Sequence, residues 1–242
     1  MARRRFFVPE VRRGIAELSG ADAEHLVRVL RVEPGQLFEV SDNRDVYLAE
    51  VERARKSEVA FRIVEKLPAP EAAARITLLA ALIKFDRFEW LVEKATELGV
   101  AAIVPFEATR TERGLMAASA KRLARWQKIA LEASQQSRRA HLPQIEQAVS
   151  WAKALELESD FRFLLDESGE TAPILDALPG SVRATDRVAL LLGPEGGWTD
   201  EERGEAKAAG WRSCSLGSTI LRTETAAVAG LAVIRAAWKS RS

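Results

Sequence analysis

The chain has 242 residues, 47% hydrophobic and 29% charged, with a formal net charge of +1; this fits a soluble globular protein and excludes disordered and fibrous classes. Its single cysteine, Cys214, excludes an intramolecular disulfide framework, and with only two histidines the usual zinc ligands are too few to indicate a metal site. No apolar run approaches the roughly 18 residues of a membrane span, and no apolar segment follows the basic start, so we expect a cytoplasmic protein without a membrane partner.

A small β-barrel is predicted at the N-terminus. Short strands are expected over residues 6–8, 36–40, 46–51 and 59–64, several of them with period-two alternation. One helix is expected over residues 21–30, with Leu26, Val29 and Leu30 on one face and Gly35 in the turn beyond. Residues 67–75 contain two prolines and an alanine run and resemble a linker. We therefore predict one domain over residues 1–68 and a second over residues 74–242.

After this linker, strands alternate with helices, which predicts an α/β domain with a mostly parallel sheet. Residues 76–83 form a continuous apolar run typical of a buried strand. Asp86 is the expected N-cap of the next helix, with Glu89 three residues on and Gly99 at its end. The apolar positions of that helix are Phe88, Leu91, Val92, Ala95 and Leu98. Further strands are expected over residues 101–106, 161–166, 187–192 and 214–217, and a last helix over residues 223–238.

A basic segment lies in the middle of the chain. Residues 110–141 contain eight Lys or Arg and two Glu, whereas residues 142–182 contain two basic and eight acidic residues. An amphipathic helix is expected here, with apolar Leu123, Trp126, Ile129, Ala130 and Ala133 and an outer face of Lys121, Arg122, Arg125 and Lys128. A protein that binds a polyanion such as RNA needs a locally basic surface, so this segment is a candidate for RNA binding. A run of charges can equally be a helix face that only contacts solvent.

Two glycine turns carry the clearest functional signal. In LLLGPEGGWTDEE, residues 190–202, an apolar strand runs into a glycine-rich turn, and Thr199 with Glu202 forms a capping box for a new helix. Residues 215–230, SLGSTILRTETAAVAG, show the same order of features: a short strand, a glycine (Gly217), an irregular loop and polar residues that begin a helix. Glycine after a strand lets backbone amides approach a ligand, so the two turns can form opposite walls of one pocket. A glycine-rich connection without a ligand, with Arg222 merely paired to Glu224, is the alternative.

These residues resemble a known family. LLGPEGGWTDEE (residues 191–202) and LGSTILRTETAA (residues 216–227) are similar to the C-terminal signature of the ribosomal RNA small-subunit methyltransferase E family of the SPOUT superfamily. RFF (5–7) and HLVRVLR (25–31) resemble its N-terminal PUA-like barrel. Lys84, EKATELGV (93–100), RWQKI (125–129), Glu132-Ala133, Gln136-Ser137, Arg139 and Pro143 resemble its central motifs. The order and full-length extent of these blocks make the match specific.

The resemblance implies a PUA-like RNA-binding barrel followed by a SPOUT domain whose C-terminal chain forms a trefoil knot, an exception among folds. It implies an S-adenosyl-L-methionine-dependent enzyme, active as a homodimer, that methylates N3 of one uridine in 16S ribosomal RNA of the small ribosomal subunit. The implied cofactor-binding residues are Leu192, Gly193, Pro194, Glu195, Gly196, Gly197, Leu216, Gly217, Ile220, Leu221, Arg222, Glu224, Thr225 and Ala226. The RNA-binding candidates are Arg4, Arg5, Arg28, Arg31, Arg110, Arg122, Arg125 and Arg139.

The sequence departs from the family pattern at two places. Ser218-Thr219 stand where a pair ending in arginine is common, and Thr109 stands where an acidic residue is usual. Arg139, Arg110 or Arg222 would then supply positive charge beside the pocket. Our catalytic hypothesis takes Glu195 as the base for the N3 proton and Arg139 or Arg222 as the group that stabilises the resulting negative charge.

Three other functions stay open from the sequence. A different SPOUT enzyme, acting on transfer RNA or on a ribose 2′-hydroxyl, would carry the same cofactor turns. An RNA-binding module without catalysis is compatible with the Ser218-Thr219 departure. A metabolic enzyme with a phosphate loop is disfavoured, because no phosphate-binding lysine accompanies the glycines.

Overall fold

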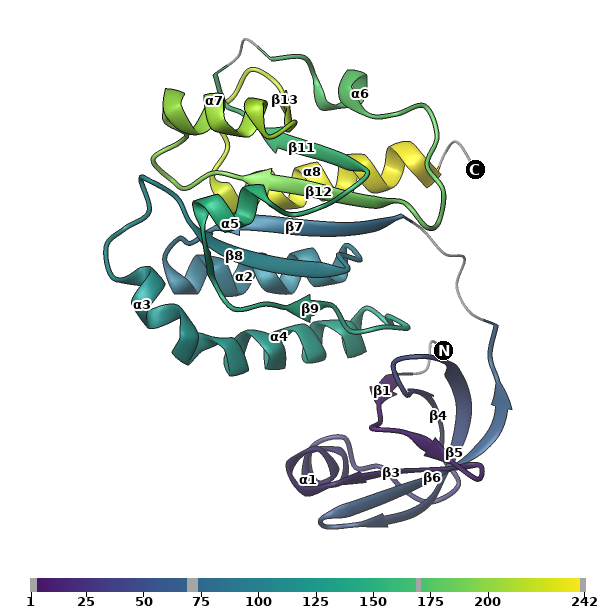
Figure 1. The fold of residues 1–242 in the computed structure, drawn as a ribbon. Helices are drawn as coiled ribbons and strands as arrows, with labels where there is room; N and C mark the ends of the chain where they lie inside the picture. Colours follow the sequence, from purple (N-terminus) through teal and green to yellow (C-terminus); the bar gives the residue numbers. More distant parts are fainter. Residues whose placement is uncertain (1–3, 69–73, 169–170, 240–242) are drawn as a thin grey trace. The chain divides into compact units, whose positions relative to one another are not determined.

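The computed structural model describes residues 4–68, 74–168 and 171–239. The chain forms two compact units (Figure 1). The first contains Met1–Ala72 together with Ser134–Leu142, and the second contains Ala73–Ala133 together with Pro143–Ser242. The sequence pattern gave no means of assigning Ser134–Leu142 to the N-terminal unit, since that assignment depends on contacts between residues about one hundred positions apart.

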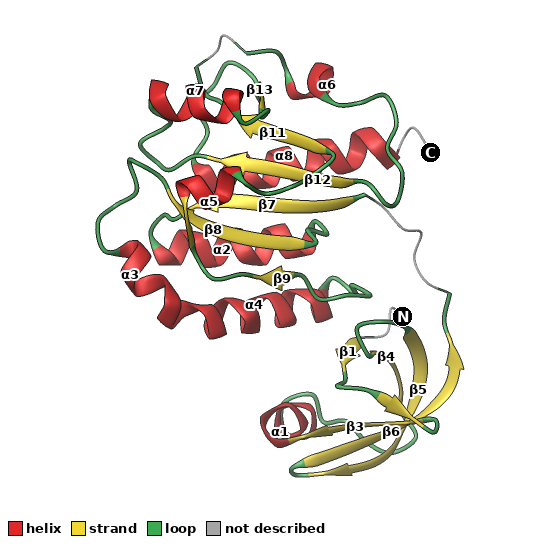
Figure 2. Ribbon diagram, in the orientation of Figure 1, coloured by secondary structure: helices red, strands yellow, loops and turns green. Residues whose placement is uncertain are grey.

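The first unit is a strongly bent sheet with one helix (Figure 2). Its strands follow the order β1-β4-β5-β6-β3-β2, and among these pairs only β1 with β4 is parallel. The elements are β1 Arg5–Phe7, β2 Val11–Arg12, β3 Ile15–Ser19, α1 Gly20–Arg28, β4 Leu37–Ser41, β5 Val46–Arg55 and β6 Glu58–Lys66. Phe6, Val40, Val51 and Phe61 are buried in its core. The predicted strands and helix are present, whereas β2 and β3 were not predicted.

One core prediction for this unit is wrong. Val29 was expected on the buried face of the helix with Leu26, but its side chain is 63% exposed while Leu26 is buried. The reason is that α1 ends at Arg28, so Val29 is the C-cap residue and no longer follows the helical face. Gly35 does lie in the turn beyond, with a φ of +85° that favours glycine.

The segment Ser134–Leu142 is bound to the first unit by polar contacts. Glu39 is buried, and its carboxylate accepts Nη2 of Arg5 at 2.7 Å and pairs with Arg138. Arg5 Nη1 also donates to the carbonyl of Arg138 at 2.6 Å, and Ser41 Oγ donates to the carbonyl of Ala140 at 2.6 Å. The two arginines offset the cost of burying the Glu39 carboxylate.

The second unit is a sheet of seven strands within the described residues, with every strand pair parallel. The order is β10-β8-β7-β12-β11-β13, with β9 also pairing with β8. The strands are β7 Arg75–Ala81, β8 Ala102–Glu107, β9 Gln144–Ile145, β10 Val149–Ser150, β11 Phe161–Leu165, β12 Arg187–Leu192 and β13 Arg212–Cys214. The helices are α2 Phe85–Glu97, α3 Leu115–Ser119, α4 Leu123–Gln136, α5 Trp151–Leu155, α6 Ile174–Ala177, α7 Asp200–Ala208 and α8 Thr223–Lys239, with a 3₁₀ turn at Ala120–Arg122.

Helices cover both faces of this sheet, as a parallel sheet requires. Because side chains alternate along a strand, Leu190 and Leu192 pack with α2, α4 and α8, whereas Ala189 and Leu191 pack with α5 and α7. The short elements α3, α5, α6, β9 and β10 were not predicted, since two to five residues are too few to show a periodic pattern.

The start of α2 differs from the prediction. The helix begins at Phe85 after Lys84, and Asp86 lies inside its first turn instead of capping it. Phe85 packs on Trp126 of α4, with ring centroids 6.0 Å apart, and this contact favours the earlier start. Glu89 forms ion pairs with Arg125 at 2.6 Å and Arg122 at 3.7 Å instead of a capping box. The helix ends at Glu97, and Gly99 lies just beyond its C-cap Leu98 with a φ of +86°.

The C-terminal chain contacts the connection between β11 and β12 before it enters α8. After β13 it pairs with the connection from β11 to β12, since Ser215 N donates to the carbonyl of Ala172 and Ile174 N donates to the carbonyl of Ser215, both at 2.9 Å. It then passes the end of β12, where Thr223 Oγ1 donates to the carbonyl of Gly193 at 2.9 Å, and enters α8. Leu231 of α8 is fully buried under the sheet.

Candidate active site

A cavity of about 580 Å³ opens at the carboxyl ends of β11, β12 and β13. Both predicted glycine turns line it, together with the chain that follows β11. The lining residues are Arg87, Leu165, Asp166, Glu167, Leu192, Gly193, Pro194, Glu195, Gly196, Gly197, Leu216, Gly217, Thr219, Ile220, Leu221, Arg222, Thr223 and Ala226. The structure thus brings the turn at residues 193–197 and the turn at residues 216–222 to one hollow.

The first turn requires glycine because protein packs closely behind it. A Cβ atom on Gly193 would lie 2.9 Å from the indole ring of Trp198, which is fully buried and donates Nε1 to the carbonyl of Leu165 at 2.8 Å. Gly197 has a φ of +69°, and a Cβ there would lie 2.3 Å from Oε1 of Glu167. The turn is therefore pressed against the domain on one side and faces the cavity with the other.

A buried carboxylate fixes the helix that follows this turn. Thr199 and Glu202 form the predicted capping box at the start of α7, and Glu202 is 1% exposed. Its Oε1 also accepts the backbone N–H of Thr109 at 2.8 Å. The neighbouring Arg110 donates Nη1 to the carbonyls of Gly196 at 2.8 Å and Trp198 at 3.3 Å. Arg110, which we proposed as an RNA-binding residue, is thus bound to the back of the turn.

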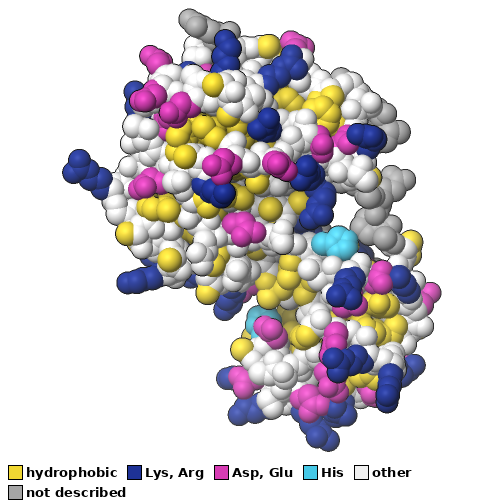
Figure 3. Space-filling view, viewed as in Figure 1, with side chains coloured by type: hydrophobic (Ala, Val, Ile, Leu, Met, Phe, Trp, Pro, Cys, Tyr) yellow, Lys and Arg dark blue, Asp and Glu magenta, His cyan; other side chains and the backbone are white. Residues whose placement is uncertain are grey.

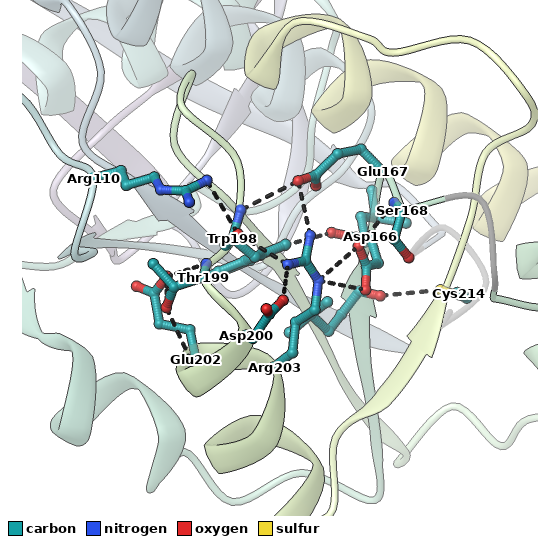
Figure 4. A network of polar contacts seen from close by, with 12 residues as sticks. Arg110, Asp166, Glu167, Ser168, Trp198, Thr199, Asp200, Glu202, Arg203 and Cys214 are labelled. Carbon is teal, nitrogen blue, oxygen red and sulfur yellow. Dashed lines mark hydrogen bonds and ion pairs between the residues drawn. The ribbon is translucent and has the colours of Figure 1, made fainter.

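Arg203 of α7 joins the first turn to the end of β11 (Figure 4). Its guanidinium donates to Asp166, which is buried, to Glu167 and Asp200, and to the carbonyl of Trp198. Burial by itself would lower the pKa of Arg203. The hydrogen bond and charge of Asp166, with the charges of Glu167 and Asp200, outweigh it and hold that pKa above its ordinary value.

The second turn begins at the buried end of β13. Cys214 is fully buried, its thiol contacts the carbonyl of Leu164, and burial raises the pKa of that thiol to about 12. Gly217 has a φ of +124° with no neighbouring atom near its Cβ position, and Ile220 is 81% exposed. The second turn therefore lines the cavity with little protein packed against its other side.

A second hollow of about 540 Å³ adjoins the cavity, and the two share Arg87 and Arg222. Its other lining residues are Asp86, Trp90, Glu224 and Thr225. Glu224 and Thr225, predicted for the cofactor, therefore lie in this hollow. The alternative pairing of Arg222 with Glu224 is not formed within the described residues, where Oε2 of Glu224 is buried without a hydrogen-bond partner. Glu195, the hypothetical base, forms an ion pair with Arg87.

The remaining RNA-binding candidates differ in exposure and in their ion-pair partners. Arg4, Arg28 and Arg31 are exposed, whereas Arg5 is buried against Glu39. Arg122 and Arg125 both pair with Glu89, and the guanidinium of Arg122 lies 4.8 Å from the centroid of the Phe85 ring. Arg139 belongs to the first unit and donates Nε to the carbonyl of His141 at 3.0 Å. On the face shown in Figure 3, basic and acidic side chains are interspersed.

Several residues that line the cavity were not predicted from the sequence: Arg87, Leu165, Asp166, Glu167 and Thr219. Asp166 and Glu167 directly follow β11, which pairs in parallel with β12. Because parallel strands end at the same edge, the sequence did contain a usable signal for these two acids. Arg87 comes from α2, and no local pattern connects it with the glycine turns.

Comparisons with known proteins identify the family. Residues 70–235 match the model of an RNA methyltransferase domain, and residues 18–64 match that of an RNA methyltransferase PUA domain. Ribosomal RNA small subunit methyltransferase E of Bacillus subtilis is 30% identical over 95% of both chains, and that of a Synechocystis strain is 34% identical over 99% of this chain and 79% of its own.

The chain belongs to the ribosomal RNA small subunit methyltransferase E family. The member from Neisseria gonorrhoeae, solved bound to S-adenosyl methionine, is 29% identical with a TM-score of 0.88 and 98% coverage of both chains. A Legionella pneumophila methyltransferase, solved with bound SAM, is 30% identical with the same TM-score, over 98% of this chain and 99% of its own. The predicted family and the PUA-like and SPOUT fold are thereby confirmed, and both of these solved relatives bind S-adenosyl methionine.

The cavity fits this methyl donor. Its volume lies in the usual range for small-molecule sites of about 300–1,000 Å³. The glycines of the first turn leave backbone groups open to the hollow, and both apolar and charged side chains line it. Among residues 4–68, 74–168 and 171–239, no cluster of three His, Cys, Asp or Glu suited to a metal ion is found. Within the same ranges, no helix is both long and apolar enough to cross a membrane.

Proposed function

We propose that this RNA methyltransferase acts on N3 of one specific uridine in 16S ribosomal RNA of the small ribosomal subunit. The observation that supports it most is the cavity that both glycine turns line, in a chain that matches named small-subunit methyltransferases over nearly its full length. The match of residues 18–64 to an RNA methyltransferase PUA domain supports an RNA substrate.

The chain's contribution to the chemistry is alignment. Bound S-adenosylmethionine supplies an activated methyl group, and transfer to a ring nitrogen is an in-line displacement that depends on how the two reactants are held. We propose that Leu192, the turn at residues 193–197 and residues 216–222 hold the cofactor, while Glu224, Thr225 and Ala226 support it from the start of α8. The tightly packed first turn would fix the reacting atoms with little rearrangement.

The N3 proton requires a base or a stabilising cation. Glu195 remains our proposed base, and Arg87, which pairs with it, would hold its carboxylate at the cavity. Arg222 is exposed and lines both hollows, which suits it to stabilise negative charge on the uridine oxygens. Arg139 is the other candidate for that role.

A pH profile of Glu195→Gln tests the base. General-base catalysis contributes about 10²- to 10⁴-fold, so we expect turnover to fall by that order. Glu205→Gln, which alters a carboxylate bound to the Trp151 indole outside the cavity lining, is the matched control. An unchanged profile for Glu195→Gln would remove this residue from the base role.

We also propose a cytoplasmic homodimer that grips RNA through exposed arginines. Arg4, Arg28 and Arg31 of the first unit have the exposure that phosphate contacts need. Because N3 is normally engaged in base pairing, the target uridine must be unpaired or flipped out. Sedimentation of the purified enzyme tests the dimer, and a monomeric mass at micromolar concentration would contradict it.

The decisive test of the substrate is to incubate the enzyme with labelled S-adenosylmethionine and small subunits from a strain that lacks the modification. Mass spectrometry of nuclease fragments should then place the label on N3 of one uridine. Label on a ribose hydroxyl or on transfer RNA would support a different SPOUT activity, and cofactor binding without any transfer would support an RNA-binding module.

A further inference from the structure

Glu167 lies just beyond the carboxyl end of β11, at the wall of the cavity. It follows Asp166 directly after that strand and lines the cavity. The adjacent parallel strand, β12, carries the first glycine turn. An acidic residue therefore stands at the end of the strand beside a glycine-rich turn, at the shared carboxyl edge of a parallel sheet.

The carboxylate of Glu167 is held from one side only. Its Oε1 accepts the backbone N–H of Trp198 at 3.2 Å and Nη2 of Arg203 at 3.0 Å. Both printed contacts end on this one oxygen, and within the described residues Oε2 accepts no hydrogen bond. The side chain is 32% exposed, so Oε2 is an oriented acceptor that a ligand can reach.

Gly197 keeps this orientation possible. A Cβ at that position would lie 2.3 Å from Oε1 of Glu167 and 3.9 Å from Oε2, so any larger residue would displace the carboxylate. Arg203 is fixed in turn by Asp166, whose two oxygens lie 3.2 and 3.1 Å from its Nε. The position of Glu167 is thus set by the same contacts that fix the first turn (Figure 4).

A carboxylate oxygen can only accept hydrogen bonds, so Oε2 of Glu167 would bind a donor group of the ligand. The donors of S-adenosylmethionine are the two ribose hydroxyls, the ammonium group and the adenine amino group. In parallel α/β folds, an acid at the end of the strand beside the glycine turn commonly accepts the ribose hydroxyls of a bound nucleotide. We propose that Glu167 Oε2 binds the ribose hydroxyls of S-adenosylmethionine. The proposal rests on the cofactor and is independent of which base is methylated.

Calorimetric titration of Glu167→Gln tests the contact. S-adenosylhomocysteine and its 2′-deoxy and 3′-deoxy analogues are the probes. A hydrogen bond to a charged group implies that the variant loses about 10- to 100-fold in affinity for S-adenosylhomocysteine. For the deoxy analogue that lacks the bound hydroxyl, wild type and Glu167→Gln should differ by less than about 3-fold. Glu167→Ala should show the same selective loss, provided that its ligand-free melting temperature stays close to that of the wild type.

Asp200→Asn is the matched control, since Asp200 also pairs with Arg203 but is fully exposed and does not line the cavity. Its affinities should equal those of the wild type. If Glu167 only supports Arg203, its variants will lose affinity equally for all three ligands. If it binds the ammonium group, the loss will persist in both deoxy analogues and disappear with 5′-methylthioadenosine, which lacks that group. Either result, or no loss at all, overturns the proposal.

Discussion

The two walls of the cavity are built differently, although both are glycine turns that follow a parallel strand. The first, residues 193–197, is backed by Arg110, which donates to the carbonyl of Gly196, and by the indole of Trp198, which lies close behind Gly193. Arg203 donates to the carbonyl of Trp198, the residue that follows the turn. In the second, residues 216–222, no side chain makes a hydrogen bond or ion pair within the described residues, and Ile220 is 81% exposed. The comparison indicates one wall that is formed before the ligand arrives and one that the ligand can adjust.

This difference has a physical cause in the adjoining helices. The helix α7 follows the first turn, and its capping box, its buried Glu202 and the ion pair of Arg203 with Asp166 fix the backbone there. The second turn leads into α8 through one side-chain contact, Thr223 Oγ1 to the carbonyl of Gly193. Regions with few buried contacts open at low free-energy cost, and binding loops are commonly drawn from them.

Arg203→Ala should have the largest effect. It leaves the Asp166 side chain, which is 3% exposed, as an uncompensated buried charge, so we expect a loss of about 3–5 kcal/mol in the free energy of unfolding. Urea denaturation measures it. Arg187→Ala is the control, because Arg187 and Asp160 are both about half exposed and such a pair contributes at most about 1 kcal/mol. Equal losses in the two variants would mean that the first wall is not specially held.

Gly197→Ala and Gly217→Ala should have the next largest effects, and they should differ from each other in their affinity for S-adenosylmethionine. Both positions have positive φ, which costs a non-glycine residue about 1–2 kcal/mol. At Gly197 the new Cβ also collides with Glu167, so we expect S-adenosylmethionine affinity to fall at least 10-fold more than in Gly217→Ala, which meets no atom within 4 Å. Gly204→Ala in α7 has neither problem and should be slightly stabilising. Equal affinities for the first two variants would remove the contrast between the walls.

Ile220→Ala should have a small and selective effect. Because the side chain is 81% exposed, stability should change by less than about 0.5 kcal/mol. If the second wall adjusts to the ligand, loss of this apolar side chain should lower S-adenosylmethionine affinity several-fold. Thermal unfolding with and without ligand separates the two quantities, and a stability loss without an affinity change would contradict an adjustable wall.

The smallest expected effect is on the labelling of Cys214, whose thiol becomes accessible only when β13, the strand before the second turn, opens. With a pKa raised to about 12 by burial, its thiol stays protonated at pH 8, so labelling by a thiol reagent should be negligible in the native protein and complete in urea. The unfolded thiol ionises near the ordinary value of 9.0, so this group makes stability fall as pH rises between about 9 and 12. Fast native labelling at pH 8 would show that β13 opens with the turn.

Local patterns predicted the parts of the fold that depend on neighbours in sequence. The glycine turns, the Thr199 capping box and the four long strands of the second unit, β7, β8, β11 and β12, were predicted because their signals lie within a few residues. The strand expected over residues 214–217 was placed too late, since β13 ends at Cys214. The assignment of Ser134–Leu142 to the first unit was missed because Glu39 and Arg138 meet across 99 positions. Asp86 was wrongly placed as a cap since the contact of Phe85 with Trp126 outweighed the local preference.

The site shows the same division. Fourteen residues were predicted for the cofactor, and twelve line the cavity, because they belong to the two turns and the residues that adjoin them. Glu224 and Thr225 line the adjoining hollow, since the first turn of α8 directs them away from the cavity. Glu167 was not predicted, although it follows a strand that is parallel to β12 and therefore ends at the same edge of the sheet. Arg87 lies on α2, where no sequence pattern connects it with the glycine turns.

Hydrogen exchange with and without S-adenosylmethionine tests the central claim most directly. If both turns enclose the methyl donor, amides of residues 193–197 and 216–222 should gain protection together, with the larger gain in the second turn because the first is already held. Protection confined to one turn, or to neither at saturating ligand, would contradict a shared site.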